Sequence, residues 1–285
     1  LDGDIQGWMH GLKELTGRRK RPEIFSKHGF YTMKPEVLLS RIRVVLCRPS
    51  HPGNIGAVAR AMKTMGLSRL YLVEPKQFPD SEADTRATGA VDVLAAAQVV
   101  PTLKDALAGA SFAVALSARQ RDIGPSLGAP RETVARLIAE AGEGEVALVF
   151  GNETMGLSNE EILHCQAAVT IPTNPEFSSL NLGSAVQVLC YECRMAAFAE
   201  KPPTGGHLST PFASPAATND EIEGLYAHLE QVMTATGFFN PAQPGRLLPK
   251  LRRLFGRARL EKDEINILRG ILASTQVKTG HGRKS

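Results

Sequence analysis

The chain has 285 residues, 43% of them hydrophobic and 22% charged, which is enough material for one full core and a second, smaller domain. This composition is typical of a soluble globular protein, and no apolar run approaches the roughly 18 residues that a membrane span needs. The first residues also lack the pattern of a secretory signal, so we expect a cytoplasmic protein without membrane contact.

Short apolar runs alternate with helical patterns along the first 200 residues. Runs such as 146–150 are apolar throughout, as in strands that are buried on both faces. The strands are expected at 44–46, 70–73, 112–116, 146–150 and 168–171, and the helices at 54–66, 83–96, 102–109, 131–141, 158–165 and 181–199. Because the two kinds of element alternate, we predict an α/β domain over residues 40–200 with a mostly parallel sheet.

The rest of the chain differs in composition from this domain. Residues 1–39 show no clear core pattern and contain four consecutive basic residues, which is typical of a solvated or disordered extension; Met33 is a candidate natural start. Residues 201–219 are rich in Pro, Gly, Ser and Thr and are interpreted as a linker. Residues 220–285 are expected to form a small α-helical domain, with helices near 225–233, 246–258 and 262–273.

Charge is distributed unevenly along the chain. Residues 1–43 hold nine Lys and Arg against five Asp and Glu, whereas residues 44–239 hold 13 against 21. Residues 240–285 are strongly basic, with 11 Lys and Arg against three Asp and Glu. Basic ends on an acidic body favour a polyanionic partner such as nucleic acid, which the ends contact through its phosphates.

The four cysteines do not indicate a disulfide framework or a metal centre. They are few and irregularly spaced for a chain of this length, so we expect reduced thiols. Cys190 and Cys193 form a lone CxxC inside a helical pattern, and no second pair completes a tetrahedral site. We therefore expect no bound metal.

The first segment whose residues suit binding or catalysis follows the strand at 44–46 and spans residues 50–63. Gly53 and Asn54 suit a turn and a helix N-cap. At about 100° per residue, Arg60 and Lys63 lie opposite the apolar face of the helix. The pattern fits a capped crossover helix with exposed bases, and it fits equally a helix that holds a phosphate.

The second segment, residues 150–158, follows the most continuous predicted strand. Ligands in α/β proteins bind beyond the carboxyl ends of strands, so Gly151 lies where a ligand is expected. The segment matches neither a dinucleotide fingerprint nor a Walker-type phosphate loop. A turn at Gly156 and an N-cap at Ser158 explain much of it, but they give no reason for Glu153.

The third segment, residues 171–186, begins with prolines that end a strand and stiffen the loop after it. Ser178 or Ser179 is expected to cap the helix that follows. Capping does not explain why Ser179 and Asn181 flank an apolar residue, an arrangement that suits the orientation of a hydroxyl group. The sequence places no His and acid beside Ser179 that would make it an acyl nucleophile.

In this order, the motifs GNxGAxARAMK, FGNExxGLS and IPxxPxxSSLN strongly resemble those of the SPOUT methyltransferases, in the TrmH-like branch that modifies ribose. The likeness covers nearly all of residues 40–200. The basic stretch 246–255, with 266–270, resembles the helical extension of the TrmJ group, which methylates nucleotide 32 of tRNA. The resemblance implies a trefoil-knotted α/β domain, a homodimer and the cofactor S-adenosylmethionine.

Residue by residue, the resemblance also implies site positions. S-adenosylmethionine should contact Leu116, Ser117, Ala118, Gly151, Ile171, Ser178, Ser179 and Leu180. The catalytic group should consist of Arg60, Asn54, Glu153, Ser179 and Asn181. RNA should contact Arg60, Lys63, Arg119, Arg252, Arg253, Arg257 and Arg259.

Arg60 has a particular role in this interpretation. The family assigns the residue at its position as the base, yet a guanidinium stays protonated in proteins. We therefore expect Arg60 of one subunit to hold the target phosphate and stabilise the developing oxyanion in the site of the other. Ser179, Asn181 and Asn54 would orient the hydroxyl or the arginine, and Glu153 would fix the loop or Arg60.

Two other functions share these features. A 2′-O-methyltransferase that acts on rRNA or on another tRNA position would carry the same three motifs, and only the basic tail favours the TrmJ group. A non-enzymatic RNA-binding module of the same fold would have no need to keep Arg60, Glu153, Ser179 and Asn181 together. The sequence distinguishes neither cytidine from uridine nor one tRNA from another.

Overall fold

A computed structural model of the chain describes residues 33–199 and 214–281, with side chains up to residue 276. The predicted extension up to residue 32 and the predicted linker up to residue 213 lie outside the described residues. The described residues from Lys34 onward belong to one compact unit.

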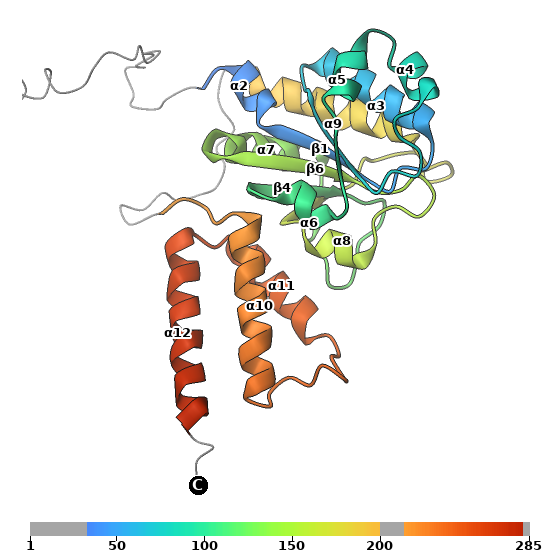
Figure 1. Cartoon of the computed structure of the whole chain (residues 1–285). Coiled ribbons are helices and arrows are strands. Elements are labelled where there is room, and N and C mark those ends of the chain that lie inside the picture. Colours follow the sequence, from blue (N-terminus) through green and yellow to red (C-terminus); the bar gives the residue numbers. More distant parts are fainter. Residues whose placement is uncertain (1–32, 200–213, 282–285) are drawn as a thin grey trace, which may run out of the picture. The chain divides into compact units, whose positions relative to one another are not determined.

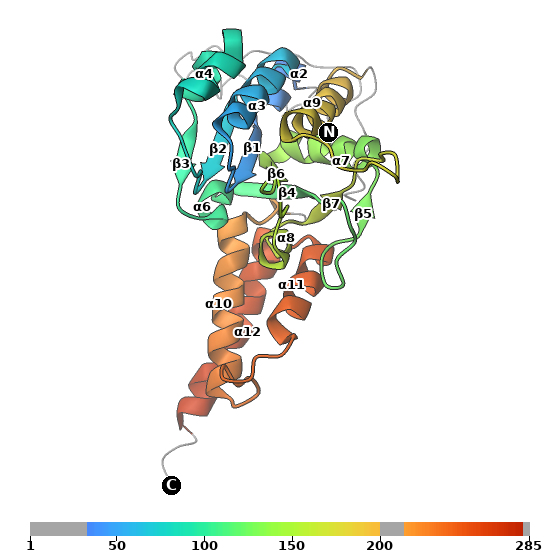
Figure 2. The ribbon, with the colours of Figure 1, turned by 90° about the vertical axis from the view of Figure 1, so that its right-hand side faces the viewer.

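A single parallel sheet of seven strands organises the described residues (Figure 1). The strand order is β3-β2-β1-β6-β4-β7-β5 (Figure 2). The strands are β1 Ile42–Cys47, β2 Arg69–Val73, β3 Gln98–Val100, β4 Ala110–Leu116, β5 Leu127–Gly128, β6 Glu145–Phe150 and β7 Ala167–Val169. The five predicted strands are confirmed. The two that were not predicted, β3 and β5, are short edge strands without a continuous apolar run.

The helices around the sheet are α2 Pro35–Ser40, α3 Pro52–Met65, α4 Ser81–Ala87, the 3₁₀ helix η1 Thr88–Ala90, α5 Val91–Ala95, α6 Leu103–Leu107, α7 Pro130–Glu143, α8 Asn159–Leu163 and α9 Leu182–Ala197. Two expectations were wrong. Helix α2 lies in a stretch expected to be unstructured, and it buries Leu39. The single helix expected at 83–96 is broken where Thr88 adopts a left-handed φ of 52°.

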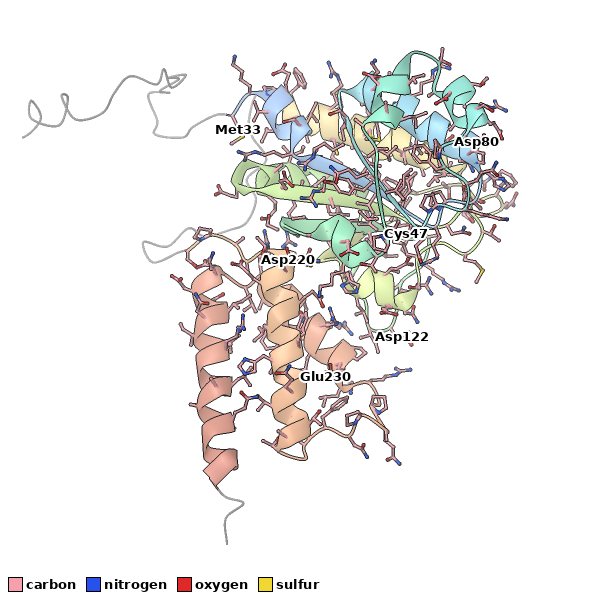
Figure 3. All side chains as sticks on the ribbon, viewed as in Figure 1. Met33, Cys47, Asp80, Asp122, Asp220 and Glu230 are labelled. Atoms are coloured by element: carbon pink, nitrogen blue, oxygen red, sulfur yellow. The ribbon has the colours of Figure 1, made fainter. Side chains whose placement is uncertain are left out.

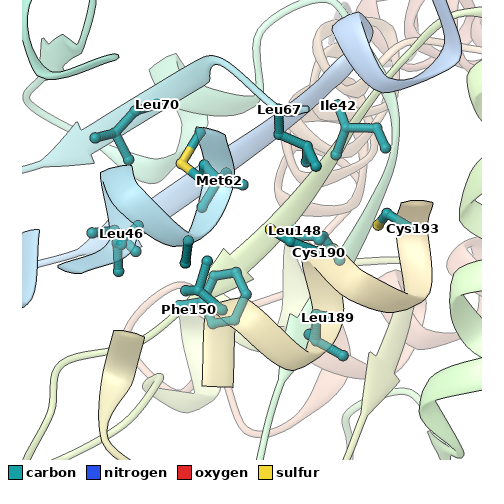
Figure 4. Packing of buried hydrophobic residues seen from close by; sticks show 14 of the residues in the cluster. Ile42, Leu46, Met62, Leu67, Leu70, Leu148, Phe150, Leu189, Cys190 and Cys193 are labelled. Carbon is teal, nitrogen blue, oxygen red and sulfur yellow. The ribbon is translucent and has the colours of Figure 1, made fainter. Parts of the chain in front are cut away.

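Strand residues alternate between two apolar layers, as the pleat of a sheet requires. On one face, Leu46 and Phe150 pack against α3 and α9, where Figure 4 shows Met62 and Leu189. On the other face, Val45 and Val149 pack with residues of α6 and α8. Helices therefore cover both faces of the sheet, which explains why its central strands are apolar throughout.

Three further helices follow the sheet domain, as predicted: α10 Asn219–Ala235, α11 Leu247–Ala258 and α12 Lys262–His281 (Figure 2). A capping box of Thr218 and Glu221 begins α10. Leu225 and Ile265 are buried in a small core that the helices share. An ion pair between Arg259 and Glu140 joins this helical domain to α7.

Candidate active site

The three sequence motifs meet at the carboxyl ends of neighbouring strands. Strand β1 pairs with β6, with Leu46 beside Phe150, so the loops that follow the two strands start side by side. Strand β4 lies next to β6, and β7 lies next to β4. The sheet order therefore gathers segments that are up to about 130 residues apart in sequence, as in Asn54 and Asn181.

Glu153 lies at the centre of this group. One of its carboxylate oxygens accepts hydrogen bonds from the backbone N–H and the hydroxyl of Ser50, at 2.9 and 2.6 Å. The other accepts from the N–H of His51 at 3.3 Å and from Nδ2 of Asn54 at 3.0 Å. Partial burial acts to raise the pKa of Glu153, but the bonds from Ser50 and Asn54 outweigh it and hold the pKa at about 2.

A chain of amides extends from Glu153 to the start of α9. Oδ1 of Asn54 accepts a hydrogen bond from Nδ2 of Asn181 at 3.0 Å, and Oδ1 of Asn181 accepts from the N–H of Gly183 at 2.9 Å. A carboxylate can only accept and a backbone N–H can only donate, so the two ends of the chain fix the orientation of both amides. Glu153 thus holds the first and third motifs in register.

Two capping expectations were wrong. Helix α3 begins at Pro52 with His51 at the N-cap position and no side-chain cap, so Asn54 lies inside the first turn, and its amide bonds Glu153 and Asn181. Helix α9 is capped by Asn181 and not by Ser178 or Ser179. The expected cap at Ser158 is confirmed, and it forms a capping box with Glu161.

The loop after β6 turns back tightly on itself. The N–H of Gly156 donates to the carbonyl of Asn152 at 2.8 Å, and Gly156 has a φ of +67°. A Cβ on Gly151 would lie 2.1 Å from the carbonyl carbon of Gly156, so only glycine fits there. The side chain of Asn152 ties this turn to the carbonyl of Arg48 after β1, at 2.8 Å.

The expected cofactor residues lie on adjacent segments. Leu116 ends β4, the N–H of Ser117 donates to the carbonyl of Val169 at 3.0 Å, and Ile171 follows two residues later. Gly151 follows β6, the other neighbour of β4. Ser178, Ser179 and Leu180 lie in the exposed loop before α9. A hydrogen bond from Thr173 to the carbonyl of Ser178, at 3.2 Å, folds this loop.

Arg60 and Ser179 stand apart from the amide chain. Both are exposed, and neither side chain makes a hydrogen bond or ion pair with another described residue. The structure therefore does not bring Arg60 to Glu153 within one chain. Lys63, one turn further along α3, forms an ion pair with Asp92 at 2.8 Å.

The basic residues of the helical domain differ in their availability. Arg253 and Arg257 are exposed, whereas Arg252 is paired through both its terminal nitrogens with Glu223. Arg259 is only 6% exposed and forms two hydrogen bonds with Glu140. Its guanidinium is not available to an RNA phosphate in this structure. We therefore no longer expect Arg259 to contact RNA, and we interpret it as a structural residue. Arg119, in the loop after β4, is exposed.

Sequence reasoning missed three residues that organise the site. Ser50 donates two bonds to Glu153, and Asn152 holds the turn after β6. Arg48 forms a bidentate ion pair with the largely buried Glu161. Their position directly after a strand was a usable signal, but their partners come from segments about 100 residues away.

Other kinds of site find no support in the described residues. The four thiols are buried, and burial raises the pKa of each, that of Cys190 to about 12. No group of three or more His, Cys, Asp and Glu is placed to hold a metal ion within the described ranges. No helix among those described is long and apolar enough to cross a membrane.

Comparisons with known proteins identify the family of the chain. Residues 41–191 match the family model "SpoU rRNA Methylase family", and residues 220–284 match "tRNA methyltransferase TrmJ, C-terminal domain". The tRNA (cytidine/uridine-2′-O-)-methyltransferase TrmJ of Citrobacter koseri is 52% identical over 241 residues, which are 84% of this chain and 98% of the relative.

Two further relatives extend the comparison. The tRNA (cytidine/uridine/adenosine-2′-O-)-methyltransferase TrmJ of Pseudomonas aeruginosa is 51% identical over 84% of this chain and 95% of its own length. The crystal structure of TrmJ from Z. mobilis matches with a TM-score of 0.71 at 33% identity, over 82% of this chain and 98% of that one. The expected fold class and group are confirmed: the chain belongs to the SpoU methylase family and, within it, to the TrmJ group.

Proposed function

We propose that the chain transfers a methyl group from S-adenosylmethionine to the ribose 2′-hydroxyl of nucleotide 32 in tRNA. The observation that carries the proposal is the hydrogen-bonded chain from Glu153 through Asn54 and Asn181, which assembles three motifs into one site. The names of the similar TrmJ enzymes support tRNA and the ribose 2′-oxygen as targets. Since tRNA is the substrate, we place the enzyme in the cytoplasm.

The residues expected to hold S-adenosylmethionine fit such a group. They lie in the segments that follow three adjacent strands, and Leu116 and Ile171 offer partly buried apolar surface. Leu180 and Phe177, in the loop before α9, are exposed apolar side chains that a bound molecule or a second subunit would cover. When bound, the cofactor supplies an activated methyl group, and the protein has to position it.

We propose that Arg60, Ser179 and the amide chain bind and orient the ribose 2′-hydroxyl. Asn54 and Asn181 are held by Glu153 and by the start of α9, so they act as positioning residues. Ser179 precedes Asn181 by two residues and its side chain is exposed, so we assign it a hydrogen bond to the 2′-hydroxyl. Arg60 carries a positive charge that can bind the target phosphate and stabilise the oxyanion.

We propose that Arg60 comes from a second copy of the chain, and therefore that the enzyme is a homodimer. Helix α9 exposes Tyr191, Met195 and Phe198 at a spacing that places them on one face. An apolar face of this kind suits a partner subunit.

We propose that each part of the chain has the function that the sequence suggests. Residues 40–200 catalyse methyl transfer, residues 201–219 form a linker, and residues 220–285 bind RNA. In the RNA-binding domain, Arg253 and Arg257 are exposed and are kept as RNA contacts. Arg60, Arg119 and Lys63 remain proposed contacts of the methyl-transfer domain. An rRNA substrate has only the family name in its favour.

Complementation between two inactive variants tests the shared site. Arg60→Lys and Ser179→Ala should each lower kcat, by on the order of 10²–10³ for the loss of an oxyanion contact at Arg60. Arg269→Lys, which changes an exposed arginine of α12, is the matched control and should keep full turnover.

If Arg60 serves the partner's site, a mixed dimer of the two variants contains one intact site. Random mixing of subunits should then restore about a quarter of the wild-type activity. If both residues act within one chain, mixing should restore none, and the shared site is rejected.

A further inference from the structure

A second candidate binding site lies away from the methyl-transfer loops. A cavity of about 390 Å³ is lined by α7 and α11 and by the segments around β5 and β7. None of the residues proposed for the cofactor or for catalysis lines it. Its volume lies in the range of sites that hold small ligands or parts of larger ones.

Guanidinium groups dominate the lining of this cavity. Arg136 comes from α7, and Arg252, Arg253 and Arg257 come from α11. Arg252 is neutralised by Glu223, whose carboxylate it meets at 2.7 Å through Nη2. The other three are not neutralised in this way.

The remaining charges leave the cavity positive. Arg136 is 3.9 Å from Glu140, but both oxygens of that carboxylate already bond Arg259, so one carboxylate faces two guanidinium groups. Arg253 donates to a neutral group, the backbone carbonyl of Asp122, at 3.0 Å (Asp122 is labelled in Figure 3). Arg257 has no ion pair or hydrogen bond with another described residue.

One acidic side chain, Glu132, opposes these groups in the lining. Arg253 and Arg257 have no ion pair and Arg136 shares the carboxylate of Glu140 with Arg259, so the single carboxylate of Glu132 leaves the lining with a positive balance. Guanidinium forks match the oxygens of a phosphodiester, and Ser126 and Thr133 add hydroxyl donors to the same lining.

Buried contacts hold the walls of the cavity in place. The ion pair of Arg259 and Glu140 fixes the end of α11 to α7, and Arg259 also donates to the carbonyl of Ser111 at 2.8 Å. Glu223 lies between Arg252 and His164, which follows α8. The site is therefore already formed before RNA binds, and binding does not have to pay the entropy of ordering these walls.

We propose that this cavity binds a phosphodiester of the tRNA backbone, away from the nucleotide that is methylated. The inference rests on the proposed function, because it takes tRNA as the substrate. It makes the RNA contact a joint property of the methyl-transfer domain, through Arg136, and of the helical domain, through Arg253 and Arg257.

Gly256→Glu tests the proposal without removing a contact. Gly256 lines the cavity within α11, and a Cβ there meets nothing within 4 Å. The change places a carboxylate among the arginines. The fold should be kept, because glutamate is a better helix former than the glycine that it replaces. Gly270→Glu is the matched control, because Gly270 lies in α12 with equally open space and outside the cavity lining.

We expect Gly256→Glu to weaken tRNA binding by on the order of tenfold relative to Gly270→Glu, and to make log Kd less steep against log salt by about 0.7–0.9 per lost phosphate contact. S-adenosylmethionine affinity and kcat at saturating tRNA should match the control. Equal tRNA affinity and equal salt slope in the two variants would overturn the proposal. It would also be overturned if 5′-AMP bound in the cavity and the affinity of the protein for tRNA stayed the same. Absence of methyl transfer by the wild-type chain would instead reject the proposed function.

Discussion

Glu153→Gln removes the charge at the centre of the site while keeping the shape of the side chain. The glutamine has one oxygen in place of two, and its NH₂ group faces donors whichever way it turns. On one side the donors are the N–H and hydroxyl of Ser50; on the other they are the N–H of His51 and the amide of Asn54. The Ser50 hydroxyl can rotate, but an N–H group cannot become an acceptor.

At least one donor is therefore left without a partner, which costs about 1–3 kcal/mol in a buried setting. Because Glu153 is only partly buried, we expect the free energy of unfolding to fall by an amount near the lower end of that range. We expect kcat/KM to fall by roughly tenfold or more, since Asn54 and Asn181 lose their anchor. The affinity for S-adenosylmethionine should change little.

Urea denaturation and steady-state kinetics at pH 7 measure the two effects, with Glu230→Gln on the exposed side of α10 as the control (Figure 3). The folded-state pKa of Glu153 is about 2, below its ordinary value of 4.5. The stabilisation is therefore complete above about pH 4.5 and is lost as the pH falls toward 2, so the two proteins should converge in stability on acidification. Wild-type kcat/KM and stability in Glu153→Gln at pH 7 would refute the anchoring role.

Three further changes test the framework around the site. Gly151→Ala should prevent the tight turn and lower the melting temperature, whereas Gly142→Ala, in open space within α7, should be neutral or stabilising; similar melting temperatures would contradict the close approach. Arg259→Met should lower the free energy of unfolding by about 3–5 kcal/mol because the buried carboxylate of Glu140 loses both its hydrogen bonds and keeps only Arg136 at 3.9 Å, and adding Glu140→Leu should recover part of it, as a double-mutant cycle would show. Glu223→Gln should be less stable than the wild type at pH 7 but equal to it as the pH falls through about 2, and a difference that persists there in urea titrations would reject the charge as its cause.

The sheet and most helices were predictable from sequence because their signals are local. Continuous apolar runs marked the five predicted strands, and these are the strands that helices cover on both faces. The edge strand β3 lacks such a run, because Gln98 and Val99 are exposed. The break at Thr88 depends on backbone geometry that no periodic pattern reveals.

The sequence motifs named candidate site residues, but they did not reveal the contacts between them. The motifs named Asn54, Glu153 and Asn181, yet they did not reveal that the three are bonded in a chain. Likewise, basic residues in the tail were read as RNA contacts without regard to their partners. The structure shows that Arg259 is buried against Glu140, which lies 119 residues earlier and gives no local signal.

The central claim is methyl transfer to a defined ribose, and mapping the modified nucleotide tests it most directly. The purified 285-residue chain, S-adenosylmethionine with a labelled methyl group and unmodified tRNA should give label on the ribose of nucleotide 32, and none when the protein is omitted. Label on a base, label only on rRNA, or no label on tRNA would contradict the account.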